Sequence, residues 1–240
     1  MWSTQRILPT GLAMVMFVLG AARGFAGETR VPAGYRMLYS QDFTSATSLA
    51  DFEFSDPTAW RYATDGGAGA LELHRQSDYQ PRVRSPLNIA LIKDRAFGDF
   101  VLEAEFVQTG REYGHRDMCL FFGAKDTANF YYVHVATAAD PHAHNVFLVN
   151  DEPRLAIATK TTKGVDWGLG VWHRIRIERS LAEGAIKVFF DDFNEPIMEA
   201  ADTHFDYGRI GFGSFDDTGK VRNIRIWGPA PAPQRAGFFR

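Results

Sequence analysis

The segment Phe130–Ala136 carries the side chains best suited to chemistry. It reads F-Y-Y-V-H-V-A, so Val133 and Val135 share one face of a strand while Tyr132 and His134 share the other. A tyrosine offers a flat ring and a hydroxyl group, and a histidine can act as a general base near neutral pH. If the protein is an enzyme, we predict Tyr132 and His134 as its catalytic residues, with His134 as the base. The alternative is a histidine buried beside an aromatic ring.

Two arginines alternate in a second segment. Arg82 and Arg84 lie two residues apart in Q-P-R-V-R-S-P, so they share a face if this segment is extended. Two guanidinium groups can hold a uronate carboxylate or a sulfate through bidentate hydrogen bonds. We predict that Arg82 and Arg84 bind substrate, and the alternative is a solvated face or a structural salt bridge.

A polar loop follows the tyrosine–histidine strand and reads D-P-H-A-H-N, ending at His144 and Asn145. We predict that these two side chains, with Asp117, bind substrate. A His-x-His pair can bind Zn²⁺, but no further ligand is fixed by spacing and the proline favours a turn, so we predict no metal here. Trp167 lies between two glycines and is predicted to be an exposed stacking platform for a sugar.

Short alternating segments punctuated by turns indicate an all-β fold, and helical periodicity is nearly absent. The segment Thr47–Phe54 is predicted as one short helix, and the link 124–129 as a hairpin loop. We also read Asp216–Gly219 as a tight turn before the last strand. The predicted strands are Met37–Phe43, Ala70–Arg75, Asn88–Lys93, Phe100–Gln108, Met118–Gly123, Phe130–Ala136, Asn145–Asn150, Arg154–Thr159 and four more between Trp172 and Trp227.

The first 26 residues have the composition of a secretory signal peptide. Arg6 precedes the apolar run Leu12–Leu19, and Gly24-Phe25-Ala26 is a small-x-small cleavage site. We predict a signal peptide at 1–26, one domain at 27–228 and a loose Pro/Ala-rich tail at 229–240. Removing residues 1–26 changes the net charge from −3 to −5, which disfavours nucleic-acid binding. Cys119 is the single cysteine, so no intrachain disulfide forms.

Six motifs follow one another in a fixed order: Trp60, Phe97–Phe106, Trp172–Ile175, Gly184–Asp191, Gly208–Phe212 and Val221–Ile226. Through them the chain from about Met37 to Trp227 resembles the concanavalin A-like lectin/glucanase superfamily, and more narrowly secreted laminin-G-like and 3-keto-disaccharide hydrolase-like domains. This resemblance implies a two-sheet antiparallel jelly-roll sandwich whose concave sheet carries a glycan groove.

The glucanase branch of this superfamily uses an E-x-D-x-x-E strand. Here Glu103 and Glu105 are followed by Gln108, and a carboxamide cannot donate the required proton. We therefore interpret both glutamates as solvated strand residues. Superfamily relatives often carry a structural calcium, to which Asp42 and the acidic turn at Asp216 could contribute oxygens, but no diagnostic spacing is present. The prediction is that no cofactor is required.

The sequence thus predicts a secreted or periplasmic, lectin-like domain that binds or acts on a poly- or oligosaccharide. It predicts no nucleic-acid partner, and no membrane association after signal removal. Two alternatives remain open. One is an enzyme, either a polysaccharide lyase acting on acidic glycans or a hydrolase of modified disaccharides, and the other is a structural laminin-G-like adhesion module.

Overall fold

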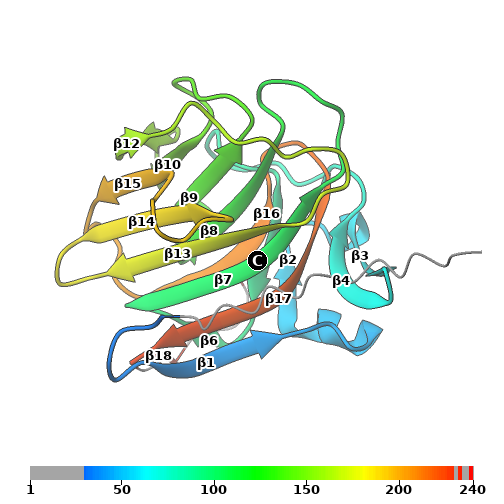
Figure 1. Cartoon of the computed structure of the whole chain (residues 1–240), viewed down its shortest axis with the longest axis horizontal. Helices are drawn as coiled ribbons and strands as arrows, with labels where there is room; N and C mark the ends of the chain where they lie inside the picture. The colour runs from blue at the N-terminus through cyan, green and yellow to red at the C-terminus, as the bar shows by residue number, and fades with distance from the viewer. Residues whose placement is uncertain (1–29, 230–231, 234–237, 240) are drawn as a thin grey trace, which may run out of the picture. The chain divides into compact units, whose positions relative to one another are not determined.

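Two antiparallel sheets form the molecule, stacked face to face (Figure 1). The computed structural model describes residues 30–229, 232–233 and 238–239, so the predicted signal peptide lies outside the described residues. Sheet A has nine strands and sheet B has seven. This confirms the all-β, two-sheet antiparallel jelly-roll prediction. Within the described residues, no helix is long and apolar enough to cross a bilayer.

The strand bounds are as follows. Sheet A contains β1 (Arg36–Gln41), β3 (Trp60–Asp65), β4 (Ala68–Leu73), β7 (Phe100–Gln108), β12 (Ala158–Thr161), β13 (His173–Ser180), β14 (Ala185–Phe190), β15 (Met198–Ala201) and β17 (Gly219–Gly228). Sheet B contains β2 (Phe52–Phe54), β5 (Asn88–Ile92), β8 (Asp117–Asp126), β9 (Asn129–Ala136), β10 (Asn145–Asn150), β11 (Leu155–Ala156) and β16 (Arg209–Ser214). A further pair joins β6 (Arg95–Ala96) to β18 (Ala232–Pro233).

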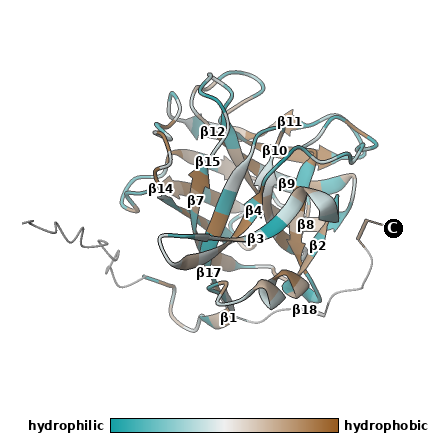
Figure 2. Cartoon of the chain, turned by 90° about the vertical axis from the view of Figure 1, so that its right-hand side faces the viewer, coloured by the Kyte–Doolittle hydropathy of each residue, from teal (hydrophilic) through white to brown (hydrophobic). Residues whose placement is uncertain are grey.

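Alternation of apolar and polar residues decides which side chains enter the core. In β13, Ile175 and Ile177 are fully buried between the sheets, whereas Arg174 and Arg176 point away from them. Phenylalanines from both layers fill the space between the sheets, among them Phe100 of sheet A and Phe122 of sheet B, whose rings meet edge to face. In Figure 2, where colour marks hydropathy, the two layers are seen from the side.

Three local predictions require correction. The predicted helix at 47–54 is a 3-10 helix, η1 (Ala46–Asp51), followed by β2, because Phe52 adopts extended backbone angles and packs into the core. A second 3-10 helix is η2 (Pro57–Ala59). The predicted strand at 154–159 divides into β11 and β12, which belong to different sheets. The turn at Asp216–Gly219 connects β16 of sheet B to β17 of sheet A rather than closing a hairpin.

Glu103 is not a solvated residue, contrary to the sequence interpretation. It does face away from the core, but it is 4% exposed because arginines of the neighbouring strand cover it. Its Oε1 atom lies 2.7 Å from Nη1 of Arg176, and its Oε2 atom lies 3.1 Å from Nη2 of Arg174. Glu105 pairs similarly with Arg222. These carboxylates therefore serve a buried charge network rather than a paired-carboxylate catalytic site.

Part of the segment predicted to be a loose tail makes contacts. The backbone N–H groups of Phe238 and Phe239 both donate to Oε1 of Glu53, and the Phe238 ring packs against the outer face of sheet B. Arg209, at the start of β16, lies over the same ring at 5.5 Å. One end of this outer face is therefore covered by an apolar side chain.

Candidate functional site

The β8–β9 hairpin brings the candidate residues onto one face of sheet B. Its register pairs Cys119 with His134, and strand alternation places Asp117, Tyr132 and these two side chains on the side away from the core. Val133 and its alternating neighbours point into the core between the sheets. The prediction that Tyr132 and His134 leave the sheet on the face opposite Val133 is confirmed.

The face that carries Tyr132 and His134 is covered, so these two side chains do not line an open groove. Tyr132 is 0% exposed and His134 is 3% exposed. The ring of Phe147 stacks on Tyr132 at 5.0 Å, and Phe215 stacks with His134 at 6.1 Å. The Arg154 guanidinium carbon lies 4.2 Å from the centre of the Phe215 ring. Segments distant in sequence thus close over the strand pair.

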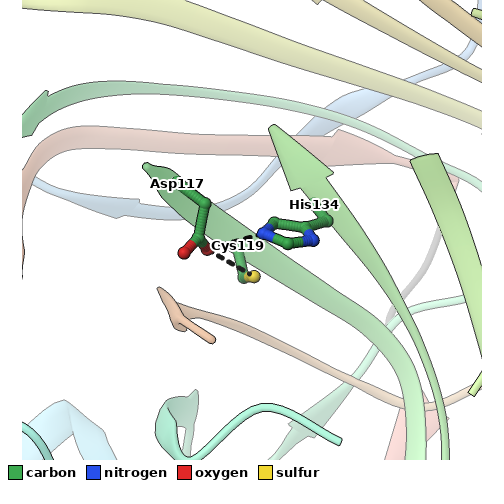
Figure 3. A group of neighbouring side chains, drawn as sticks. All are labelled: Asp117, Cys119 and His134. Atoms are coloured by element: carbon green, nitrogen blue, oxygen red, sulfur yellow. Dashed lines mark hydrogen bonds and ion pairs between the residues drawn. The ribbon is translucent and has the colours of Figure 1, made fainter. Parts of the chain in front are cut away.

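Asp117 is the most enclosed charged group of this cluster (Figure 3). Its Oδ1 atom accepts from Oγ of Ser214 at 3.0 Å, and its Oδ2 atom accepts from the backbone N–H of Phe215 at 3.0 Å. Oδ2 also accepts from Sγ of Cys119 at 3.1 Å and lies 3.4 Å from Nε2 of His134. Burial opposes ionisation, but His134 and these hydrogen bonds hold the pKa of Asp117 below its usual value. Burial and the Asp117 charge raise the pKa of the Cys119 thiol.

A second carboxylate lies beside Asp117. Burial raises the pKa of Asp217 to about 6, a hydrogen bond from the Tyr113 hydroxyl opposes that rise, and the Asp117 charge adds to it. Oδ2 of Asp217 accepts from Tyr113 at 2.8 Å and from the backbone N–H of Asp117 at 3.1 Å. Oxygens of Asp216 also lie within 4.8 Å of those of Asp117 and Asp217. Among the described residues Asp42 belongs to no such group, so the calcium ligand set considered from sequence does not form.

Four buried polar atoms of this cluster lack a hydrogen-bond partner among the described residues. They are the Tyr132 hydroxyl, Nε2 of His134, and Nε and Nη1 of Arg154. Arg154 also lies close enough to Tyr132 to act on its ionisation. Burial raises the Tyr132 pKa well above its usual value, and the Arg154 charge opposes that rise. Buried polar groups in native proteins are nearly always satisfied, so these four atoms can take partners from water or from a ligand.

The remaining predicted residues have diverse surroundings. Arg82 is exposed and pairs with Asp151, and Arg84 is exposed in a bend rather than a strand, which corrects the shared strand face. The Arg84 carbonyl accepts from the backbone N–H of Arg154 at 3.3 Å. Oδ1 of Asn145 accepts from the backbone N–H of Ala158 at 3.0 Å, an internal contact.

His144 and Trp167 are structural, in contrast to their predicted surface roles. Nδ1 of His144 accepts from the backbone N–H of Ala136 at 3.3 Å, and its Nε2 lies 2.9 Å from Oγ1 of Thr162. Burial lowers the pKa of His144 to about 4. Trp167 is 1% exposed and donates from Nε1 to the Val135 carbonyl at 3.2 Å, so it cannot be an exposed platform. Its apolar ring fills the core beside that strand.

Sequence reasoning missed Cys119, Arg154 and Phe215. Cys119 follows Asp117 by two residues, so strand alternation alone places both on one face, and the predicted hairpin would have set it near His134. Arg154 and Phe215 carry no such signal, because each reaches the cluster from a segment outside the hairpin.

Comparison with known proteins supports the fold. No protein-family model matches the chain, and no curated protein matches its sequence. The solved carbohydrate-binding module CBM66 from Bacillus subtilis is 16% identical with a TM-score of 0.53, and the match covers 74% of this chain and 96% of that one. The winged bean acidic lectin complexed with methyl-α-D-galactose is 11% identical with a TM-score of 0.55, covering 84% and 100%.

A third similar structure is domain 4 of AbnA, a GH43 extracellular arabinanase from Geobacillus stearothermophilus, in complex with arabinotriose. It is 10% identical with a TM-score of 0.50, and the match covers 80% of this chain and 92% of that domain. These likenesses show that the chain has a lectin-like β-sandwich fold, and its place in the concanavalin A-like superfamily remains a prediction. A nearer relationship to laminin-G-like or keto-disaccharide hydrolase-like domains remains a prediction.

Proposed function

We propose that the chain is an exported carbohydrate-binding domain whose ligand is an acidic oligo- or polysaccharide. The glycan lies over the outer face of sheet B, at the Asp117 end of β8. Three structures of similar fold support a sugar ligand, since one is a carbohydrate-binding module and two hold a galactoside or arabinotriose. Export follows from the predicted signal peptide at 1–26.

Arg154 is the observation that carries the preference for an acidic sugar. Its guanidinium is held over Phe215 and Phe147, and its Nη2 donates to the His142 carbonyl at 3.1 Å. No carboxylate of the described residues lies within ion-pair distance of it, and two of its nitrogens have no partner. A half-buried cation without an anion has lost part of its hydration and is unfavourable. A carboxylate that accepts two parallel hydrogen bonds from the guanidinium compensates for this loss.

The surroundings of Arg154 fit a sugar ring with a carboxylate. Arg84 lies next to it through the backbone hydrogen bond, is exposed, and has no ion pair among the described residues. Phe215 is half-buried, and Leu155 is 61% exposed, so both offer apolar surface to the C–H face of a pyranose. We therefore assign the uronate carboxylate to Arg84 and Arg154. Arg82 is already paired with Asp151.

Affinity electrophoresis of the protein beginning at residue 27 tests this proposal against uronate-containing, sulfated and neutral polysaccharides. We expect retardation by uronate-containing chains. Arg154→Gln should weaken it by about tenfold to a hundredfold, the equivalent of one charge-assisted hydrogen bond. Arg82→Gln is the matched control, because it removes the same charge from an exposed pair, and it should bind nearly as well as the parent. Equal losses in both variants, or equal retardation by neutral chains, would refute the proposal.

A lyase acting on the same glycans is the second candidate, because Tyr132 and His134 lie beneath the same arginine. Such an enzyme removes the C5 proton of a uronate and expels the sugar linked at C4, which leaves a C4–C5 double bond. Binding is favoured because both candidate bases are buried. Ultraviolet absorbance of unsaturated products, measured in the same screen, decides between them: product formation that Tyr132→Phe abolishes would replace the binding function with the lyase.

A further inference from the structure

Three side chains with different metal-ligating groups, a carboxylate, a thiol and an imidazole, lie close together beneath Arg154 and Phe215. Asp117 and Cys119 come from β8, and His134 comes from the paired strand β9 (Figure 3). One ligand atom from each, namely a carboxylate oxygen, Sγ and an imidazole nitrogen, lies within 4.8 Å of the other two. All three residues are buried, with exposed fractions of 0%, 0% and 3%.

The hydrogen bonds of His134 leave Nε2 as the coordinating atom. Nδ1 lies 3.2 Å from the His142 carbonyl, and since a carbonyl can only accept, Nδ1 carries the hydrogen. In the neutral ring, Nε2 then carries a lone pair and no hydrogen, so it is an acceptor. It lies 3.4 Å from Oδ2 of Asp117, which is an acceptor too. Either a proton on Nε2 or a metal ion must therefore lie between these two atoms. A carbonyl that fixes the opposite ring nitrogen is also the usual support of a metal-bound histidine.

The nearest alternative is a proton on Nε2, which would make His134 an imidazolium paired with Asp117. An N–H group at this position would point along the ring nitrogen's axis, yet Nε2 makes no hydrogen bond of acceptable geometry. A hydrogen bond needs the N–H group to point at the acceptor, whereas a metal ion lies off the line that joins two of its ligand atoms. The positions of Nε2 and Oδ2 suit a shared metal ion better than a hydrogen bond.

The spacing of the ligand atoms matches a tetrahedral zinc site. Zinc bonds of about 2.0–2.3 Å at tetrahedral angles give edges of about 3.4 Å between nitrogen and oxygen and about 3.6 Å between sulfur and oxygen. The corresponding separations are 3.4 Å for His134 to Asp117 and 3.1 Å for Cys119 to Asp117. An outward movement of the sulfur by about 0.5 Å brings its separation from the oxygen to the tetrahedral length, and the sulfur and the His134 nitrogen lie within 4.8 Å of each other.

Charge and outer contacts favour the same ion. A thiolate and a carboxylate neutralise a divalent cation, so the occupied site carries no net charge into the buried cluster. Ser214 holds Oδ1 of Asp117, and the backbone N–H of Phe215 holds Oδ2, so the carboxylate is already oriented. A mixed set of one sulfur, one nitrogen and one oxygen suits Zn²⁺ and excludes Ca²⁺ and Mg²⁺, which prefer oxygen alone.

We propose that Asp117, Cys119 and His134 form a binding site for one Zn²⁺ ion, with a fourth position left for water. The spacing of residues in sequence predicted no metal, because the three ligands meet only through the register of the β8–β9 hairpin. This proposal does not depend on glycan binding, which uses Arg84, Arg154 and Phe215 instead. Each can therefore fail without the other.

Cobalt substitution tests the site with an unambiguous signal. Because Cys119 is the only cysteine, any thiolate-to-cobalt charge-transfer band must arise from it. The full-length protein is refolded from urea with Co²⁺, so that entry into a buried site does not limit binding, and excess ion is removed. We expect one Co²⁺ per chain, a near-ultraviolet charge-transfer band, intense tetrahedral d–d bands, and displacement of all three signals by Zn²⁺.

Substitutions distinguish the residues that bind the metal directly from those that hydrogen-bond a metal ligand. Cys119→Ser should abolish the charge-transfer band, and Ser214→Ala should retain the band but weaken Zn²⁺ binding by about tenfold to a hundredfold, as loss of an outer contact does. His115→Ala is the matched control, since His115 pairs with Asp140 on the surface and lacks a sulfur neighbour. Saturation of the wild-type protein with Co²⁺ without a charge-transfer band, or failure to retain any Co²⁺, overturns the proposal even if a variant does not fold.

Discussion

His144 provides a quantitative test of the conclusion that this residue serves the fold. It is fully buried, and its ring receives one hydrogen bond from the Ala136 backbone and makes another with Thr162. Burial lowers its pKa from 6.5 to about 4, and the hydrogen bond from the Ala136 backbone opposes part of that shift. The folded protein therefore holds the neutral ring, and the unfolded chain takes up a proton first as the pH falls.

The sign and size of the effect follow from this difference in pKa. Stability from a neutral buried histidine is complete above pH 6.5 and is lost as the pH falls from there through about 4. With those two pKa values, a change from pH 7 to pH 5 removes about 2 kcal/mol of unfolding free energy through this group alone. Other groups titrate over the same range, Asp217 among them, so the comparison must be made between variants.

The perturbation is His144→Asn, because the backbone at this position has a φ angle of 53°, which asparagine tolerates better than most residues. Urea unfolding at pH 7 and pH 5 gives the two free energies for each protein. The variant should be less stable at pH 7, and the gap should narrow by about 2 kcal/mol at pH 5. Thr162→Val is the control: it removes a hydrogen-bond partner but keeps the titrating ring, so its pH dependence should follow the wild type. Parallel losses in His144→Asn and the wild type would falsify the reasoning.

Two further substitutions test the structural assignments, with the same unfolding measurement as readout. Trp167→Ala should lower the unfolding free energy by about 3–5 kcal/mol, because it removes a fully buried ring, and it should leave the glycan affinity of the folded fraction unchanged. An intact fold with lost affinity would restore the tryptophan as a sugar platform. Glu103→Gln should destabilise by about 3 kcal/mol, because Arg174 and Arg176 lose a shared buried carboxylate. A stable Glu103→Gln protein that loses a carbohydrate-cleaving activity would contradict the structural role.

The sequence determined the faces of strands better than their surroundings. Alternation placed Val133 inside and His134 outside because side-chain direction in a strand depends only on the residue's own position. Whether the outside face meets solvent depends on other segments. Phe147 comes from the adjacent strand, but Arg154 and Phe215 come from loops whose paths no local pattern specifies. Exposure of the candidate site was therefore predicted wrongly although its orientation was predicted correctly.

The same reasoning explains the errors at Trp167 and Glu103. Glycines on either side of a tryptophan indicate a turn, and turns are usually at the surface, but the indole ring here turns inward to donate to the Val135 carbonyl. Glu103 was assigned to solvent because its neighbours in β7 face the core, yet the adjacent strand presents Arg176 directly opposite it and Arg174 at the diagonal position. A cross-strand partner can bury a polar face as completely as the core buries the other.

The outer face of sheet B is covered by different kinds of side chain at its two ends. At the Ala124 end of β8, the cover is Phe238, and the Arg209 guanidinium above that ring is paired with Glu53. At the Asp117 end, the cover is Arg154, which has no carboxylate partner among the described residues. If the cover served only to exclude water, an apolar side chain would suffice at both ends, since an unpaired buried cation is destabilising. The lack of a carboxylate partner for Arg154 thus supports the proposal of an anionic ligand at this end of the face.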